Sequence, residues 1–191
     1  KLDLPKDWRV KFQPADDIGD RPSLDTLGPF RWSPSPATQW ELTDGQGKQH
    51  TLADYTGRPV IVIFYLGKGC AHCIEQLGTF APKTDLFRQA GIDLIAISTD
   101  DVDGLRETVQ QDKTGTPFPF PLVSDASLKV FKQYRAYDDF EQQPLHGTFL
   151  IDRQGLVRWQ DISYEPFTEA EFLLRESKRL LAQDPPQVTQ R

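Results

Sequence analysis

Residues 60–73 decide how this chain folds, and they read VIVIFYLGKGCAHC. The first seven form a continuous β-branched and aromatic run, which is typical of a strand buried on both faces. A helical spacing of apolar residues begins at Ile74 and ends near Gly91, and a second apolar run follows at residues 92–98. This order of strand, helix and strand predicts a parallel βαβ unit, with Pro82 kinking its helix.

Further elements are predicted on both sides of this unit from turn, capping and periodicity signals. In chain order they are a hairpin at residues 39–52, a helix at 102–111 capped by Asp100-Asp101, a strand at 122–123, a helix at 126–134, a hairpin at 148–159 and a helix at 168–181. The fold class is therefore α/β, with a mixed central sheet and helices on both faces. We interpret His50, in the first hairpin, as a solvated strand residue.

Three regions are predicted along the chain. Residues 1–36 contain six of the fifteen prolines and no sustained period, yet they hold two tryptophans and two phenylalanines. We expect an extension that packs on the body, and a disordered linker to an upstream domain stays open as the alternative. Residues 37–183 form the main domain, and residues 184–191, which begin Asp-Pro-Pro, form a disordered tail.

Composition excludes several classes of function. The chain has 191 residues and a net charge of −6, which argues against nucleic acid as a partner. Its longest apolar run, residues 60–66, falls far short of the roughly 20 residues of a membrane helix, so no membrane span is expected. The chain starts at Lys1 and contains no methionine, which leaves room for a removed targeting signal or for other domains upstream.

The two cysteines, Cys70 and Cys73, fall where the buried strand passes into the helix. Unpaired backbone N–H groups and the macrodipole at a helix N-terminus stabilise a thiolate there. With this spacing the second sulfur reaches the first, so the pair can cycle between dithiol and disulfide. Lys68 and His72 are expected to add positive charge beside the pair.

Structural zinc and inert core cysteines are the less interesting interpretations of the same pair. Zinc in a structural site needs four ligands. The chain offers no second cysteine pair and only three histidines, which are His50, His72 and His146. A Cys-x-x-C motif after a strand of a βαβ unit instead favours redox chemistry.

Four segments carry a resemblance to a known family: residues 52–60, 64–73, 120–125 and 147–155. Through them, residues 37–182 resemble the redoxin group of thioredoxin-fold proteins, which includes peroxiredoxins and the thiol–disulfide oxidoreductases of cytochrome maturation. The resemblance implies a thioredoxin-like fold and a redox enzyme whose cysteines carry the electrons, so no cofactor is expected.

Two chemistries compete within that group. By resemblance to thioredoxin-type enzymes, Cys70 is the attacking thiol and Cys73 the resolving thiol, and the partner is a protein thiol or disulfide. By resemblance to peroxiredoxins, with their pattern Pro-x-x-x-Thr-x-x-Cys, Cys73 is peroxidatic and Cys70 resolves. Leu66 stands at the proline position, Cys70 at the threonine and His146 at a peroxiredoxin arginine, whereas Gln76 fits that group's Glu or Gln. We therefore favour dithiol–disulfide exchange and keep peroxidase activity as the alternative.

His146 has two interpretations, a residue that faces the Cys pair as a base or metal ligand and a hydrogen-bonded loop histidine. Cys70, Cys73 and His146 suit Cu(I), and related thioredoxin-fold copper chaperones use two cysteines and a histidine, so a Cu(I)-binding or metal-delivery module is a third hypothesis. The predicted catalytic residues remain Cys70 and Cys73, with Lys68, His72, Gln76 and His146 in support and no resident metal. An extracytoplasmic compartment is slightly favoured over the cytoplasm, because it suits an oxidant.

Overall fold

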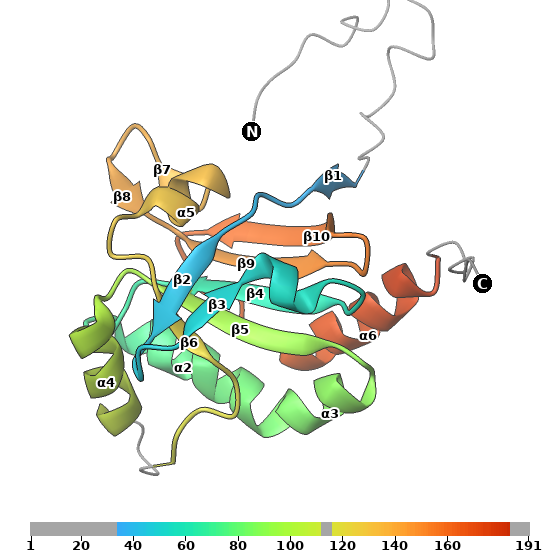
Figure 1. Ribbon diagram of the computed structural model, residues 1–191, viewed down its shortest axis with the longest axis horizontal. Helices are drawn as coiled ribbons and strands as arrows, with labels where there is room; N and C mark the ends of the chain where they lie inside the picture. Colours follow the sequence, from blue (N-terminus) through green and yellow to red (C-terminus); the bar gives the residue numbers. More distant parts are fainter. Residues whose placement is uncertain (1–33, 112–115, 184–191) are drawn as a thin grey trace, which may run out of the picture. The chain divides into compact units, whose positions relative to one another are not determined.

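The computed structural model describes residues 34–111 and 116–183 (Figure 1). Residues 1–33 of the predicted extension and the predicted tail, residues 184–191, lie outside the described residues. None of the helices in the described ranges is both long and apolar enough to cross a membrane.

An eight-stranded sheet forms the centre of the fold, in the order β1-β10-β9-β4-β5-β6-β2-β3 (Figure 1). Its strands are β1 (Ser35–Pro36), β2 (Glu41–Asp44), β3 (Gln49–Thr51), β4 (Val60–Tyr65), β5 (Asp93–Ser98), β6 (Leu122–Ser124), β9 (His146–Ile151) and β10 (Leu156–Ser163). The β4–β5 and β5–β6 pairs are parallel, and every other pair in the sheet is antiparallel. The predicted mixed sheet is therefore confirmed.

Strand β4 lies in the middle of this sheet, and all six of its side chains are buried. Because successive side chains point to opposite faces of a strand, alternate residues enter two separate cores. Val60, Val62 and Phe64 pack on the face that carries α5 (Lys129–Gln133). Ile61, Ile63 and Tyr65 pack on the other face, against the remaining helices. The prediction of a doubly buried strand is confirmed.

Those remaining helices are α2 (Ala71–Phe80), α3 (Thr84–Gln89), α4 (Val102–Gln111) and α6 (Ala170–Leu181). Figure 1 shows α2, α3 and α6 along one side of the sheet. The expected kink lies between α2 and α3, where Pro82 occupies the 3-10 turn η2 (Ala81–Lys83). Proline lacks an amide N–H and clashes with the preceding turn, which breaks the α-helical ladder at this point. Gly91 ends the segment with a φ of 72°.

The remaining predicted helices and hairpins are of the correct type, but some of their boundaries differ from the prediction. Both hairpins form, β2 with β3 and β9 with β10. Helix α5 starts three residues later than predicted. The carboxylate of Asp125 accepts the N–H groups of Lys129, Val130 and Phe131, so the first helical turn begins at Lys129 and not directly after Asp125. A short 3-10 turn, η1 (Leu52–Tyr55), and a small hairpin of β7 (Tyr137–Asp138) and β8 (Gln143–Pro144) were not predicted.

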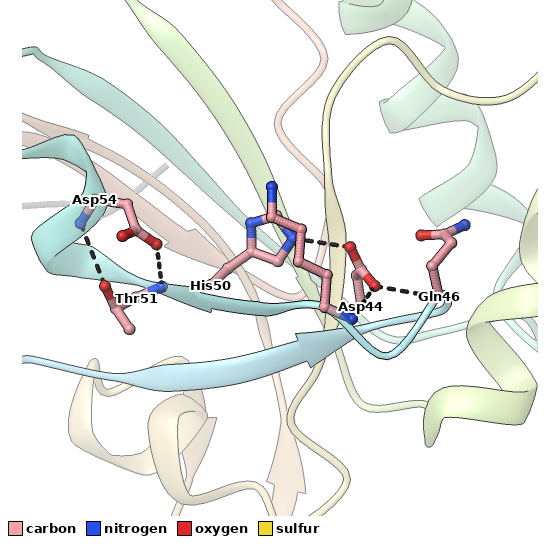
Figure 2. Close-up of polar contacts among 6 residues, drawn as sticks. Asp44, Gln46, His50, Thr51 and Asp54 are labelled. Carbon is pink, nitrogen blue, oxygen red and sulfur yellow. Dashed lines mark hydrogen bonds and ion pairs between the residues drawn. The ribbon is translucent and has the colours of Figure 1, made fainter.

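The interpretation of His50 as a solvated residue is wrong. His50 is buried beside Asp44, and its Nε2 lies 2.8 Å from Asp44 Oδ2 (Figure 2). The other oxygen of Asp44 accepts the N–H groups of Gln46 and Lys48, at 2.9 Å each. Burial alone would raise the pKa of Asp44, but the hydrogen bonds from His50 and these two N–H groups outweigh it and hold the pKa below its usual range. The carboxylate therefore closes the β2–β3 turn from inside.

Replacing this carboxylate should make stability depend less on pH. Because the pKa of Asp44 is lowered in the folded state, its contribution is present above the unfolded value near 3.8 and is lost as the pH falls through the folded pKa. Asp44→Asn should lower the free energy of unfolding by about 1–3 kcal/mol at pH 7. Urea unfolding at a series of pH values should show that the difference in free energy of unfolding between the variant and wild type becomes smaller below about pH 4.

Asp139→Asn is the control, because Asp139 is exposed and its change should stay within about 0.5 kcal/mol. If Asp44→Asn lowers the free energy of unfolding by the same amount from neutral to acid pH, the assigned role of the carboxylate is contradicted.

Candidate redox site

A disulfide joins Cys70 and Cys73, with their Cα atoms 5.3 Å apart. Cys70 is the N-cap of α2, and Cys73 lies in the first turn of this helix. The two sulfurs differ in exposure, because Cys70 is half-buried whereas Cys73 is fully buried. The structure thus presents the oxidised form of the predicted pair, with one sulfur near solvent and one in the core.

Backbone N–H groups point at both sulfurs. The N–H of Cys73 donates to Cys70 Sγ at 3.2 Å, and the N–H of Leu66 donates to Cys73 Sγ at 3.3 Å. In the reduced protein the same groups would stabilise negative charge on either sulfur, as the helix N-terminus does. The N–H of Leu66 comes from the end of the predicted strand run, and only the folded loop brings it to the sulfur.

The loop between β4 and α2 is held by Asp100, which follows β5. Asp100 Oδ2 accepts the N–H of Lys68 at 2.8 Å. Gly67 has a φ of 86°, and a Cβ atom on it would lie only 2.5 Å from Asp100 Oδ1. A side chain therefore has no room at Gly67. The expected capping by Asp101 is present, because its carboxylate accepts the N–H of Gly104 in α4.

His146 begins β9 and faces the Cys pair. Its Nε2 lies 3.1 Å from Cys73 Sγ and 3.7 Å from Cys70 Sγ. On the other side of the ring, Nδ1 lies 2.7 Å from the carbonyl oxygen of Tyr164. Because a carbonyl only accepts, Nδ1 carries a proton, and Nε2 of the neutral ring turns its lone pair toward the sulfurs. Of the two interpretations of His146, the geometry supports the one in which it faces the pair.

Burial governs the charge of this histidine. Desolvation lowers the pKa of His146 below its usual value of 6.5, although the hydrogen bond to Tyr164 partly opposes this. The ring is therefore neutral at pH 7, in the form that accepts a proton at Nε2.

The other predicted supporting residues lie around the pair in different ways. Gln76, one turn after Cys73, is buried and donates to the carbonyl of Phe167 at 3.1 Å and to Thr148 Oγ1 at 3.4 Å. It thereby ties α2 to β9. The ammonium of Lys68 pairs with Glu107, and the exposed ring of His72 lies 3.8 Å from the carboxylate of Glu75. Both side chains have a carboxylate partner, so their electrostatic effect on the cysteines stays a prediction.

This sheet order, with a Cys pair at the junction of β4 and α2, defines a redoxin of thioredoxin-like fold. The AhpC/TSA family matches residues 34–160, and the chain belongs to that family. The predicted family resemblance is therefore confirmed.

Curated relatives of the chain are named as peroxiredoxins. The chain is 32% identical over 126 residues to peroxiredoxin Q, chloroplastic, of Oryza sativa subsp. japonica, a match that covers 65% of this chain and 56% of the relative. The peroxiredoxin Q of Suaeda salsa is 34% identical over 118 residues, covering 61% of this chain and 53% of the relative. The chain thus spans about half the length of the curated relatives that it matches.

Two solved structures share the fold at low sequence identity. The peroxidoxin BcpB of Mycobacterium tuberculosis has a TM-score of 0.67 at 21% identity, over 80% of this chain and 97% of that one. The AhpC of Enterococcus faecalis has a TM-score of 0.70 at 17% identity, over 81% and 96%. The plant relatives are named as chloroplastic, so the comparisons do not favour the extracytoplasmic compartment that was predicted, and they give no support to domains upstream of Lys1.

The state of His146 can be measured directly. We expect a long-range ¹H–¹⁵N NMR titration to find the ring protonated on Nδ1 at pH 7, with a pKa below 6.5, because burial disfavours the charged ring. The same histidine in denaturant serves as the reference and should titrate at the ordinary value. A folded pKa above that reference, or a proton on Nε2 in the neutral ring, would contradict the assigned geometry.

Proposed function

We propose that this protein is a thiol–disulfide oxidoreductase that exchanges electrons with a protein partner through Cys70 and Cys73. The observation that carries the proposal is the difference in exposure between two bonded sulfurs. The half-exposed Cys70 can attack a partner sulfur or be attacked by one, whereas Cys73 is buried in the core. An exchange enzyme needs this division between a thiol that meets the substrate and a thiol that releases it.

When the protein reduces its partner, the first step belongs to Cys70. Its thiolate attacks one sulfur of the partner disulfide, so a Cys70–partner bond forms and the partner S–S bond breaks. The leaving partner thiolate takes a proton from water. The N–H of Cys73 and the N-terminus of α2 stabilise the attacking thiolate before this step.

The second step that completes this reduction of the partner belongs to Cys73 and His146. The neutral Nε2 of His146, 3.1 Å from Cys73 Sγ, accepts the thiol proton. The Cys73 thiolate then attacks Cys70 Sγ, the Cys70–Cys73 bond forms, and the second partner sulfur leaves as a thiolate that is protonated. Two electrons have passed to the partner disulfide, and the same steps in reverse oxidise a partner dithiol. The reduction potentials of the two couples set the direction.

Single cysteine variants test these roles with insulin as the protein disulfide. Cys73→Ser should stop at the mixed disulfide, which intact mass spectrometry would detect as an insulin-chain adduct on Cys70. Cys70→Ser should lose insulin reduction by about 100-fold or more, because the remaining sulfur is buried. Asp85→Asn is the control, since this exposed side chain of α3 pairs with Arg88 and its loss should leave the rate unchanged. Full activity in Cys70→Ser together with an adduct on Cys73 would reverse the assignment.

Peroxide reduction is the second candidate, and the relatives named peroxiredoxins favour it. In this reaction the Cys73 thiolate attacks one peroxide oxygen and the O–O bond breaks. Cys73 sulfenic acid forms, and the hydroxide that leaves takes a proton from solvent and becomes water. The Cys70 thiol then displaces water and gives the same disulfide. The N–H of Leu66 and the ring of His146 are the groups that surround the reacting sulfur. They stand in place of the proline, threonine and arginine pattern of peroxiredoxins.

Hydrogen peroxide separates the two candidates. Because the orienting arginine and threonine are replaced, we expect the reduced protein to react no more than about 10-fold faster than a free thiolate. The reaction would be followed by stopped-flow fluorescence of the four tryptophans, with Cys70→Ser and dimedone used to trap Cys73 sulfenic acid. Rapid, stoichiometric sulfenic acid formation on Cys73 would make peroxidase activity the primary function.

A further inference from the structure

Three metal-binding atoms converge at the redox site. Cys70 Sγ, Cys73 Sγ and His146 Nε2 all lie within 4.8 Å of one another, and no other group of this kind occurs in the described residues. The first two come from the start of α2 and the third from the start of β9, so two regular elements hold all three.

The histidine is also oriented as a metal ligand is. Metal-binding histidines usually donate their second ring N–H to a carbonyl or carboxylate, which fixes the ring and its tautomer. Here Nδ1–H donates to the carbonyl of Tyr164 at 2.7 Å, and the Nε2 lone pair points at the two sulfurs. A buried imidazole held in this tautomer presents one nitrogen atom to a cation at the sulfurs.

We propose that the reduced protein binds one Cu(I) ion through Cys70 Sγ, Cys73 Sγ and His146 Nε2. Thiolate sulfur selects soft cations such as Cu(I), and hard cations such as Mg²⁺ and Ca²⁺ prefer oxygen ligands. A structural Zn(II) site takes four protein ligands, whereas this group offers three. The donor set therefore suits a soft ion of low coordination number.

One of the two nitrogen–sulfur distances already matches a planar three-coordinate ion. Metal bonds of about 2.3 Å to sulfur and about 2.0 Å to imidazole nitrogen would place nitrogen and sulfur roughly 3.7 Å apart. The observed separations from His146 Nε2 are 3.1 Å to Cys73 Sγ and 3.7 Å to Cys70 Sγ. Reduction of the disulfide frees the two sulfurs to separate, and the half-exposed Cys70 is the side from which an ion enters.

Binding and disulfide formation exclude one another, because only thiolates bind the ion. Two thiols lose two protons when Cu(I) binds, no electron is transferred, and the complex of two thiolates with one Cu(I) carries one negative charge. Since the ion binds the dithiol and not the disulfide, Cu(I) stabilises the reduced form and withdraws it from exchange. This metal site uses the same cysteines as the proposed function. It requires that the two cysteines are reduced, but not that they catalyse disulfide exchange.

An anaerobic competition titration tests the site. Fully reduced protein is added to the coloured complex of Cu(I) with bathocuproine disulfonate, and loss of colour measures transfer of the ion. Wild type should take up one Cu(I) per chain, and the oxidised protein should take up none. His146→Ala should weaken the affinity by at least about 10-fold. Asp85→Asn, an exposed change on α3, should bind as wild type does.

Cys70→Ser provides a second variant in case His146→Ala fails to fold, as judged by circular dichroism. It leaves the core intact and should lose tight binding altogether. No transfer from the competitor, equal affinity in wild type and His146→Ala, or one ion shared by two chains would each overturn the proposal. The insulin assay on the same reduced samples without copper tests the proposed function separately. A failure of copper binding therefore does not count against disulfide exchange, and a failure of insulin reduction does not count against copper binding.

Discussion

Burial of β4 on both faces is the constraint on which the site depends. Six consecutive side chains from Val60 to Tyr65 enter two cores, and each contributes about 1.5–3 kcal/mol relative to an exposed position. The strand therefore has one position and one register between β9 and β5. Because the chain must turn immediately after Tyr65, the Gly67 loop and the start of α2 are placed at the end of the most rigid element. The position of β4 therefore also fixes the position of the two sulfurs.

Several partners compete for the same two sulfurs. In the structure each sulfur bonds the other. In the proposed exchange Cys70 bonds a partner sulfur, and in the proposed metal complex both sulfurs bind a soft cation. His146 takes part in each state through one atom, Nε2, because the carbonyl of Tyr164 occupies the other nitrogen. In the two proposals together, the orientation of a single imidazole links proton transfer at Cys73 with the affinity of the reduced pair for metal.

Local pattern was enough to predict the elements that position the cysteines. The run at residues 60–66, the glycines after it and the break at Pro82 each act through neighbouring residues, so the strand, the loop and the kinked helix followed from the sequence. The helix-cap position of Cys70 followed in the same way. The β7–β8 hairpin was missed because its strands have two residues each, which is too short for any alternating pattern.

Contacts between distant residues could not be predicted in this way. His146 meets Cys73 across 73 positions in the chain because Gly147 of β9 pairs with Phe64 of β4, and that register depends on the whole sheet. The burial of His50 depends likewise on Asp44, whose carboxylate turns inward to close the hairpin. In both histidines the sequence showed a polar residue in an extended segment, and only the tertiary structure supplied its partner.

The most direct test is a redox titration of the wild-type protein in glutathione buffers, with free thiols counted by mass after alkylation at equilibrium. If Cys70 and Cys73 form a reversible redox pair, they should lose their thiols together in a single two-electron transition. Only species with two free thiols or none would then be populated. Two thiols that remain free in the most oxidising buffer, or a stable glutathione adduct on one cysteine, would contradict this account.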